Sequence, residues 1–271
     1  MIKLIAADLD GTLLDDSHAL PPRTAEMISD LERTGKIFAA ASGRQYYSVK
    51  KLFDNIGVSD KMIFMAENGG AIYYHDRPIC SEALPADDVL NFIELLEKMP
   101  DVRVLLSGEK AAYIKKGSIS REFGFNADLY CERLKETDDL RAAVLADRII
   151  KIAVFDPCAE TGCYPVLKKY SDDFGVMLSN VQWVDIVGKT VNKGSGLKRI
   201  ADHLGISADE CMAFGDYLND LEMIEFARFG YAMENAHPAL KAAAYGIAPP
   251  NSRFGVISVV YDKVLSDKRD G

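Results

Sequence analysis

The sequence predicts an α/β protein whose core is a doubly wound, Rossmann-like parallel sheet interrupted by an inserted α+β domain. Near both ends of the chain, short apolar runs that suit strands buried on both faces alternate with helical patterns, as in βαβ units. Between these regions the alternation gives way to clustered strands and separate helices. We therefore expect a core formed by residues 1–83 and 188–271 and an insert formed by residues 84–187.

The composition excludes several classes of partner. The chain has 271 residues with 41 acidic and 32 basic side chains, and the formal charge of −9 argues against nucleic-acid or anionic-membrane surfaces. No apolar stretch approaches the ~20 residues that span a bilayer, and we expect no signal peptide. The five scattered cysteines complete no zinc pattern. We expect reduced thiols, a cytoplasmic location, and a monomer or small homo-oligomer.

The first part of the core should contain buried strands separated by helices and turns. In order, we expect a strand over 4–7, a polar flap over 11–21, a helix from Pro21-Pro22 to about residue 34, and strands over 37–41, 62–65 and 71–74. Proline suits the first position of the helix, and Gly35 suits its end. The Asn68-Gly69 pair is typical of a plain hairpin turn between the last two strands.

The insert and the second part of the core follow the same reasoning. In the insert we expect helices over 87–99, near 120, over 138–146 and over 161–170, and strands over 102–106, 111–114, 149–155, 176–179 and 183–187. After it we expect a helix from Asn192 to Leu204 that Gly205 ends, strands over 211–214, 229–233 and 246–248, and helices from 221 and over 255–265.

Four polar clusters fall at expected strand ends or helix starts. They are Asp8 with Asp10, Ser42, Lys193, and Asp216 with Asn219 and Asp220. Because the carboxyl ends of parallel strands share one edge of a sheet, the four clusters can meet there. Taken singly, they also fit an Asx-rich turn, a helix N-cap, a solvated lysine and helix N-terminal carboxylates. Their joint occurrence favours a functional site.

The residue types in these clusters suit the binding of a metal ion and a phosphate. Asp8 and Asp216, with the backbone near Asp10, can hold Mg²⁺, because hard divalent cations prefer oxygen ligands. Ser42 with its neighbouring N–H groups, and the side chains of Lys193 and Asn219, can hold phosphate oxygens.

The paired carboxylates also suit covalent phosphoryl transfer. Once the negative charge is neutralised, the Asp8 carboxylate can attack phosphorus and form an aspartyl-phosphate. Asp10, two residues further on, can protonate the leaving oxygen and later deprotonate the attacking water. The sequence therefore predicts a nucleophile and a general acid/base on one strand end.

The clusters resemble the four signature motifs of the haloacid dehalogenase (HAD) superfamily of phosphatases. The motifs are Asp8-Leu9-Asp10-Gly11-Thr12, Ser42, Lys193, and Gly215-Asp216 with Asn219-Asp220. The insert is similar to the α/β (type IIB) cap of the Cof-type subfamily, and the likeness spans essentially the whole chain. The resemblance implies a HAD core with a cap that closes over small phosphorylated metabolites, commonly sugar phosphates.

The resemblance also implies a role for each motif residue. Asp8 would be the nucleophile, Asp10 the acid/base, and Mg²⁺ would bind Asp8, the Asp10 carbonyl and Asp216, with Asp220 lying behind these ligands. Phosphate would contact the backbone of Leu9 and Gly43 and the side chains of Ser42, Lys193 and Asn219. The chain departs from the family at Tyr217, where a small residue is usual, so Tyr217 either narrows the site or contacts substrate.

Residues of the insert that could contact the leaving group are less sharply marked. The candidates are Trp183, Asp185, Lys115, Lys116 and Arg121. The simpler interpretation is that the tryptophan is packed in the interior and that the charged side chains are solvated. The leading function is a Mg²⁺-dependent phosphomonoester hydrolase of small phosphorylated metabolites. A sugar phosphomutase on the same scaffold and a non-catalytic phosphate-binding regulator stay open as alternatives. The Cof-like cap favours hydrolysis over mutase activity, and the acid at Asp10 argues against a regulator.

Overall fold

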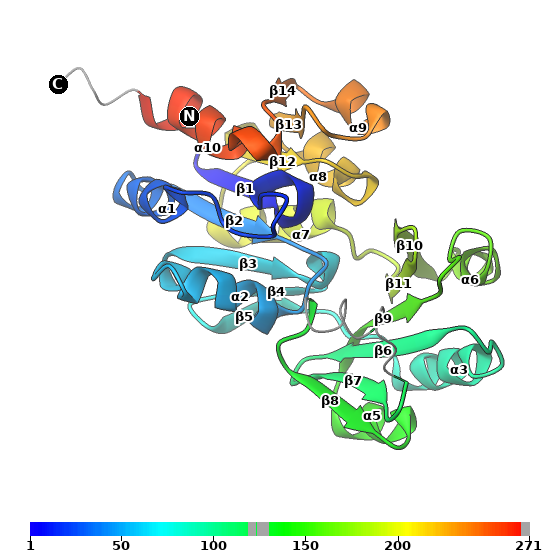
Figure 1. The fold of residues 1–271 in the computed structure, drawn as a ribbon. Coiled ribbons are helices and arrows are strands. Elements are labelled where there is room, and N and C mark those ends of the chain that lie inside the picture. Colours follow the sequence, from blue (N-terminus) through cyan, green and yellow to red (C-terminus); the bar gives the residue numbers. More distant parts are fainter. Residues whose placement is uncertain (119–122, 124–129, 267–271) are drawn as a thin grey trace. The chain divides into compact units, whose positions relative to one another are not determined.

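The computed structural model describes residues 1–118, 123 and 130–266. The chain forms two compact units, one of Met1–Cys80 with Asn192–Gly271 and the other of Ser81–Val191, which we call the core unit and the insert unit (Figure 1). The sequence analysis placed the insert at residues 84–187. The insert unit is slightly longer at both ends, since it also contains residues 81–83 and 188–191. The helix expected near residue 120 lies outside the described residues.

The core unit contains a doubly wound sheet. Its strands in the described residues are β1 (Leu4–Asp8), β2 (Ile37–Ala41), β3 (Met62–Ala66), β4 (Ala71–Tyr74), β5 (Arg77–Ser81), β12 (Cys211–Gly215), β13 (Phe229–Met233) and β14 (Gly246–Ala248), in the order β14-β13-β12-β1-β2-β3-β4-β5. The pairs from β14 to β3 are parallel, and β4 returns antiparallel to β3. The strand order reverses direction at β1, which is where open α/β sheets bind ligands. The predicted fold class is confirmed.

Helices connect the strands of the core sheet. They are α1 (Thr24–Arg33), α2 (Tyr46–Asp54), α7 (Lys193–Leu204), α8 (Leu221–Phe226), α9 (Pro238–Ala243) and α10 (Gly255–Val260). Helix α1 packs against α10, and α7 packs against α8. Gly35 and Gly205 follow α1 and α7 with positive φ values of 71° and 66°, as the sequence predicted for helix ends.

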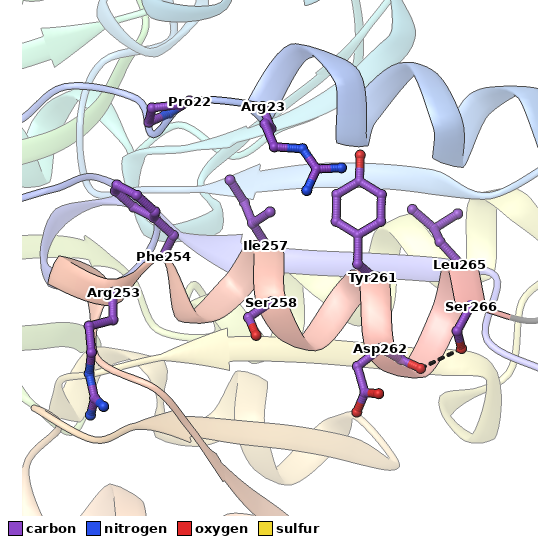
Figure 2. A pocket seen from close by; sticks show the side chains of 10 residues that line it. All are labelled: Pro22, Arg23, Arg253, Phe254, Ile257, Ser258, Tyr261, Asp262, Leu265 and Ser266. Carbon is purple, nitrogen blue, oxygen red and sulfur yellow. Dashed lines mark hydrogen bonds between the residues drawn. The ribbon is translucent and has the colours of Figure 1, made fainter.

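Helix α1 begins later than its two prolines predict. Arg23, at the N-cap, has a left-handed φ of 70°, so the helix starts at Thr24. The Arg23 guanidinium lies 4.3 Å from the ring centroid of Tyr261, and its Nε donates to Glu26 at 2.9 Å. Figure 2 shows this contact at the edge of a groove of about 600 Å³ along α10. The left-handed residue that precedes α1 thus contacts Tyr261, which directly follows α10.

The insert unit is an α+β module, as predicted. Its described strands are β6 (Arg103–Gly108), β7 (Ala112–Lys115), β8 (Leu134–Thr137), β9 (Ile149–Phe155), β10 (Phe174–Asn180) and β11 (Trp183–Gly188), in the order β10-β11-β9-β6-β7-β8, with α3 (Ala86–Leu96), α5 (Leu140–Ala146) and α6 (Cys163–Leu167). The pairs are antiparallel except β7 with β8. Every residue of β9 is buried, because apolar clusters cover both faces of this central strand.

The short elements β5, β8 and α9 were among those that the sequence analysis missed. Strands β5 and β8 are at the edges of their sheets and carry partly exposed residues, so they lack the apolar runs that mark buried strands. Helix α9 has six residues, too few for a clear helical period. In the described part of the chain, the helices are too short or too polar to cross a membrane.

Candidate active site

The four predicted clusters meet at the carboxyl edge of the core sheet. Strand β1 ends at Asp8, which is in register with Ala41 of β2, the residue before Ser42. Ala7 is in register with Phe214 of β12, so the Asp216 cluster follows on the other side. Parallel pairing of β1 with both neighbours therefore brings three distant segments together. The first turn of α7 adds the fourth cluster.

Lys193 lies at the centre of this site. Its ammonium group donates to Asp8 Oδ1 at 2.5 Å and to Asp220 Oδ1 at 2.6 Å, and the residue is 1% exposed. Burial by itself lowers the pKa of Lys193, but attraction to Asp220 and Asp8 outweighs it and raises the pKa above its usual value. Lys193 is therefore a charged, fully paired group, and the solvated-lysine reading is wrong.

The capping of α7 fixes the direction of Lys193. Asn192 Oδ1 accepts a hydrogen bond from the backbone N–H of Ser195 at 2.7 Å, and Ser195 Oγ accepts one from the N–H of Asn192 at 3.1 Å. This capping box defines the first residue of the helix. The side chain of Lys193 is thereby held at the sheet edge.

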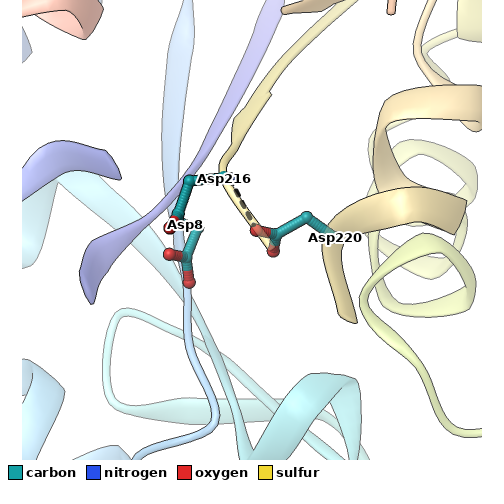
Figure 3. A group of neighbouring side chains, drawn as sticks. All are labelled: Asp8, Asp216 and Asp220. Atoms are coloured by element: carbon teal, nitrogen blue, oxygen red, sulfur yellow. Dashed lines mark hydrogen bonds between the residues drawn. The ribbon is translucent and has the colours of Figure 1, made fainter. Parts of the chain in front are cut away.

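Three carboxylates share the site with Lys193. Oxygen atoms of Asp8, Asp216 and Asp220 all lie within 4.8 Å of one another (Figure 3). Thr12 Oγ1 donates to Asp216 Oδ1 at 2.8 Å, and Asp220 Oδ2 accepts from the backbone N–H groups of Asp216 and Tyr217 at 3.0 and 3.2 Å. Each carboxylate is held in a fixed orientation by groups around it.

The three carboxylates carry more negative charge than Lys193 balances. Burial raises the pKa of Asp8 despite the opposing charge of Lys193, and the charges of Asp220 and Asp216 raise it further. Burial and the charge of Asp220 also raise the pKa of Asp216 to about 6. Ionised oxygens that repel one another in a confined space fit a hard divalent cation. The donor set present in the chain therefore fits Mg²⁺.

Asp10 is held apart from the other carboxylates. It lies in the turn Leu9–Leu13, where Gly11 has a φ of 80°. Arg44 Nε donates to Asp10 Oδ2 at 2.8 Å, Arg44 Nη2 donates to Oδ1, and His18 Nδ1 lies 3.0 Å from Oδ1. The Arg44 side chain is 2% exposed. Sequence reasoning missed both partners of Asp10, because only the fold shows that Arg44 is buried.

Gly11 is required by the packing of this turn. A Cβ atom at residue 11 would lie 2.4 Å from Oδ2 of Asp216, and the positive φ also disfavours other residues. The Asp-x-Asp-Gly pattern therefore has a steric cause as well as a chemical one. It lets the turn after β1 approach the loop after β12.

The predicted phosphate-binding residues lie around the same edge. Leu9 is buried directly after Asp8, Ser42 is buried at the end of β2, and Ser42 Oγ accepts from the N–H of Arg44 at 3.1 Å. Helix α2 starts at Tyr46 with Gln45 at its N-cap, so the plain N-cap reading of Ser42 is wrong. Asn219 Nδ2 donates to Asn68 Oδ1 at 3.4 Å, a contact that sequence reasoning did not foresee.

The side chain of Tyr217 lies beside His237. Its ring lies edge-on to His237 with the centroids 6.0 Å apart, and the residue is partly exposed. Its backbone, in contrast, supports Asp220. A tyrosine side chain at this position is therefore compatible with the acidic cluster.

The candidates in the insert unit divide into buried and exposed residues. Trp183 packs against Phe155 and Phe123, with ring centroids 5.4 and 5.7 Å away, as the packed-tryptophan reading expects. Asp185 is buried and accepts from Ser179 Oγ at 2.8 Å, so it is not a solvated charge. Lys115 and Lys116 are exposed, and Arg121 lies outside the described residues.

Comparison with known proteins places this geometry in a family. The family model of haloacid dehalogenase-like hydrolases matches residues 5–260. The 5-amino-6-(5-phospho-D-ribitylamino)uracil phosphatase YbjI of Escherichia coli (strain K12) is 32% identical over 269 residues, 97% of this chain and 96% of that protein. The enzyme YitU of Bacillus subtilis (strain 168), which has the same phosphatase name, is 27% identical over 264 residues, 93% of this chain and 94% of YitU.

Solved structures agree with this relationship. SMU.1108c of Streptococcus mutans UA159 superposes with a TM-score of 0.88 at 28% identity and covers 98% of this chain and 100% of its own. The HAD subclass IIB sugar phosphatase BT4131 has a TM-score of 0.82 over 96% of this chain and 98% of its own, and at 22% identity it shows the shared fold. The chain therefore belongs to the haloacid dehalogenase-like hydrolases and is a phosphatase of that family.

Proposed function

We propose that this protein hydrolyses phosphomonoesters of small metabolites with bound Mg²⁺, through an aspartyl-phosphate on Asp8. The observation that carries the proposal is the group formed by buried Asp8 and Asp220 and half-buried Asp216 around the ammonium of Lys193. Such a group is costly to a folded protein unless a cation occupies it. It would also put a carboxylate nucleophile beside the ammonium of Lys193 and a bound cation, two positive charges that would offset those of a phosphate dianion.

The metal ion has a suitable set of oxygens. Asp8, Asp216 and the backbone carbonyl of Asp10 would hold it, and Asp220, fixed by two backbone N–H groups, would support them from behind. When bound, the ion would neutralise charge on the phosphoryl oxygens and act as a Lewis acid. Nucleophilic attack and proton transfer are carried out by side chains of this chain.

Asp8 and Lys193 act together in the first step. Asp8 attacks phosphorus, and Lys193, already 2.5 Å from Asp8, stabilises the negative charge that the equatorial oxygens carry in the transition state. The bond between phosphorus and the leaving oxygen breaks as the bond to Asp8 forms. Leu9 and Gly43 N–H groups, with the side chains of Ser42 and Asn219, hold the phosphate oxygens (a role that the family resemblance implies).

Asp10 acts as the general acid in the first step and as the general base in the second. It protonates the leaving alkoxide first, and its carboxylate then accepts a proton from the water that attacks the aspartyl-phosphate. The bidentate contact with Arg44 fixes the plane of this carboxylate. A fixed carboxylate orientation favours proton transfer along one direction.

We further propose that the insert unit selects the leaving group. The relative YbjI is named for a substrate with a phosphoribityl chain, and BT4131 is titled a sugar phosphatase, so a sugar or sugar-alcohol phosphate is the preferred class. The indole N–H of Trp183 is buried without a hydrogen-bond partner in the described part of the chain, which suits a donor to a substrate hydroxyl. The cytoplasmic location and the monomer or small homo-oligomer remain predictions.

The test is phosphate release from a panel of phosphorylated metabolites, measured with Mg²⁺ and with EDTA. We expect release by the wild type with Mg²⁺ only, and a loss of at least about 10⁴-fold in Asp8→Asn. Circular dichroism and thermal unfolding would verify that the variant is folded. Release by Asp8→Asn at the wild-type rate would refute the assigned nucleophile. Transfer of phosphate to a second sugar position without release would favour the phosphomutase alternative.

A further inference from the structure

The turn that follows β3 has an unusual backbone. Glu67 and Asn68 are consecutive non-glycine residues in the left-handed region, with φ values of 51° and 55°. Both are 2% exposed. This region is unfavourable for residues with a Cβ atom, and such strain persists only where the surroundings impose it. The sequence analysis read Asn68 as part of a plain hairpin turn.

This turn is tied to the Ser42 cluster through its backbone. The N–H of Asn68 donates to the Ser42 carbonyl at 3.0 Å, and the N–H of Glu67 donates to the Arg44 carbonyl at 3.1 Å. A Cβ atom added at Gly43 would lie 3.1 Å from Asn68 Oδ1, so the two residues are in close contact. The left-handed conformation thus directs two N–H groups at the loop that should bind phosphate.

The same turn reaches the other two phosphate-binding clusters. Asn68 Oδ1 accepts the hydrogen bond from Asn219 Nδ2 at 3.4 Å. Gly69, with a φ of 95°, lies so close to the start of α7 that a Cβ atom there would be 2.5 Å from the carbonyl oxygen of Asn192. That residue immediately precedes Lys193. One four-residue turn therefore contacts the Ser42 loop, Asn219 and the first turn of α7.

We propose that Asn68 is a positioning residue for phosphate binding, which holds Asn219 and the Ser42–Gly43 backbone around the phosphoryl group. The proposal rests on the proposed phosphatase function. Asn68 does not touch the reacting atoms in this scheme. It keeps Asn219 directed at the phosphate, and the strain at Glu67 and Asn68 is the cost of that arrangement.

The chain contains a matched control for backbone strain. His75 and Asp76 join β4 to β5 and are also consecutive left-handed residues, with φ values of 49° and 57°. They form a two-residue hairpin connection, for which positive φ at both residues is the normal geometry. Both are exposed, and the His75 ring lies against the neighbouring Tyr74, with the ring centroids 3.9 Å apart. Strain at His75 therefore needs no functional explanation.

The experiment compares Asn68→Gly with His75→Gly. Glycine adopts both conformations freely, so each variant relieves strain, and we expect an unchanged or slightly higher Tm for both. In Asn68→Gly we expect kcat/KM to fall at least about 10-fold and the Ki of inorganic phosphate as a competitive inhibitor to rise. In His75→Gly both quantities should equal those of the wild type. Equal kinetics in the two variants would overturn the proposal.

A double-mutant cycle tests whether Asn68 acts through Asn219. We expect the Asn68→Gly/Asn219→Ala protein to lose little beyond the loss in Asn219→Ala alone, because the two residues share one interaction. Fully additive losses would overturn the proposed route. If the wild type releases no phosphate, the proposed function fails. If the wild type is active and Asn68→Gly behaves like His75→Gly, only the present inference fails.

Discussion

The two units of this protein each bury a lysine beside an aspartate, but the two sites differ in charge. Lys193 in the core unit contacts Asp8 and Asp220 at 2.5 and 2.6 Å, and Asp216 adds a third carboxylate to the group. Lys151 in the insert unit lies 3.6 Å from Asp185, whose Oδ2 also accepts from Ser179 Oγ at 2.8 Å.

The excess of carboxylates around Lys193 is the feature that suits a bound cation. Around Lys193 the carboxylates outnumber the ammonium, and burial together with this like charge raises the pKa of both Asp8 and Asp216. At Lys151, the ammonium lies beside a carboxylate that also accepts a hydrogen bond from a hydroxyl. A buried pair alone is therefore weak evidence for function. An excess of one charge is the more informative sign.

The most direct test of this comparison removes each lysine. Lys193→Met is expected to lower kcat by at least about 10²–10³-fold, since it removes charge stabilisation in the transition state. Lys151→Met is expected to leave kcat unchanged and to lower the free energy of unfolding by about 3 kcal/mol, since it removes the ammonium beside the buried carboxylate of Asp185. Steady-state kinetics and denaturant unfolding measure both. A similar decrease in kcat in the two variants would contradict the proposed difference between the sites.

The second effect concerns the carboxylate that lies outside the acidic group. Asp10→Asn is expected to slow turnover by about 10²–10⁴-fold, because an amide cannot transfer the proton in either step. Asp15→Asn is the matched control, since Asp15 is partly exposed and its carboxylate accepts hydrogen bonds from Ser17 and Ala19 within its own turn. Single-turnover kinetics would show accumulated phospho-enzyme in Asp10→Asn. Wild-type kinetics in that variant would rule out Asp10 as the acid/base.

The third effect is a pH dependence of stability in the metal-free protein. The folded-state pKa of Asp216 is raised to about 6, compared with about 3.9 in an unfolded chain. The folded state therefore binds more protons between these values, so the stabilising contribution is complete below pH 4 and is lost as pH rises through about 6. We expect Tm to fall over this window in the wild type relative to Asp216→Asn.

Magnesium should reduce this dependence. A bound cation favours the ionised carboxylates and thereby offsets the destabilisation above pH 6. The measurement is the difference in Tm between wild type and Asp216→Asn from pH 4 to 8, with and without Mg²⁺. A difference that is constant with pH in the metal-free proteins would contradict the assigned charge excess.

The smallest effect should come from the insert unit. Trp183→Phe keeps the packing of the ring but removes the buried N–H donor, and we expect a rise of about three- to tenfold in KM for a sugar phosphate with kcat retained. Tm reports any structural loss. Asp185→Asn extends the test to the neighbouring carboxylate. Unchanged KM and kcat in both variants would mean that these residues are purely structural.

The sequence alone predicted the parts of the molecule that depend on local chemistry. Apolar runs such as Leu4–Ala7 marked the buried strands, and Gly35 and Gly205 marked helix ends, because left-handed residues there favour glycine. The two-residue spacing of Asp8 and Asp10 and the order of the polar clusters indicated the sheet edge. Because the carboxyl ends of parallel strands share one edge of a sheet, those clusters could be expected to meet at that edge.

Only the tertiary structure decided how charged and strained residues are paired. Arg44 binds Asp10 and Lys193 binds Asp8 through contacts that join segments distant in the sequence. Burial sets the pKa of Asp216, and contacts with the Ser42 loop impose the conformation of Asn68. A sequence gives the type and spacing of such residues. Their desolvation, partners and strain depend on which segments the folded sheet brings together.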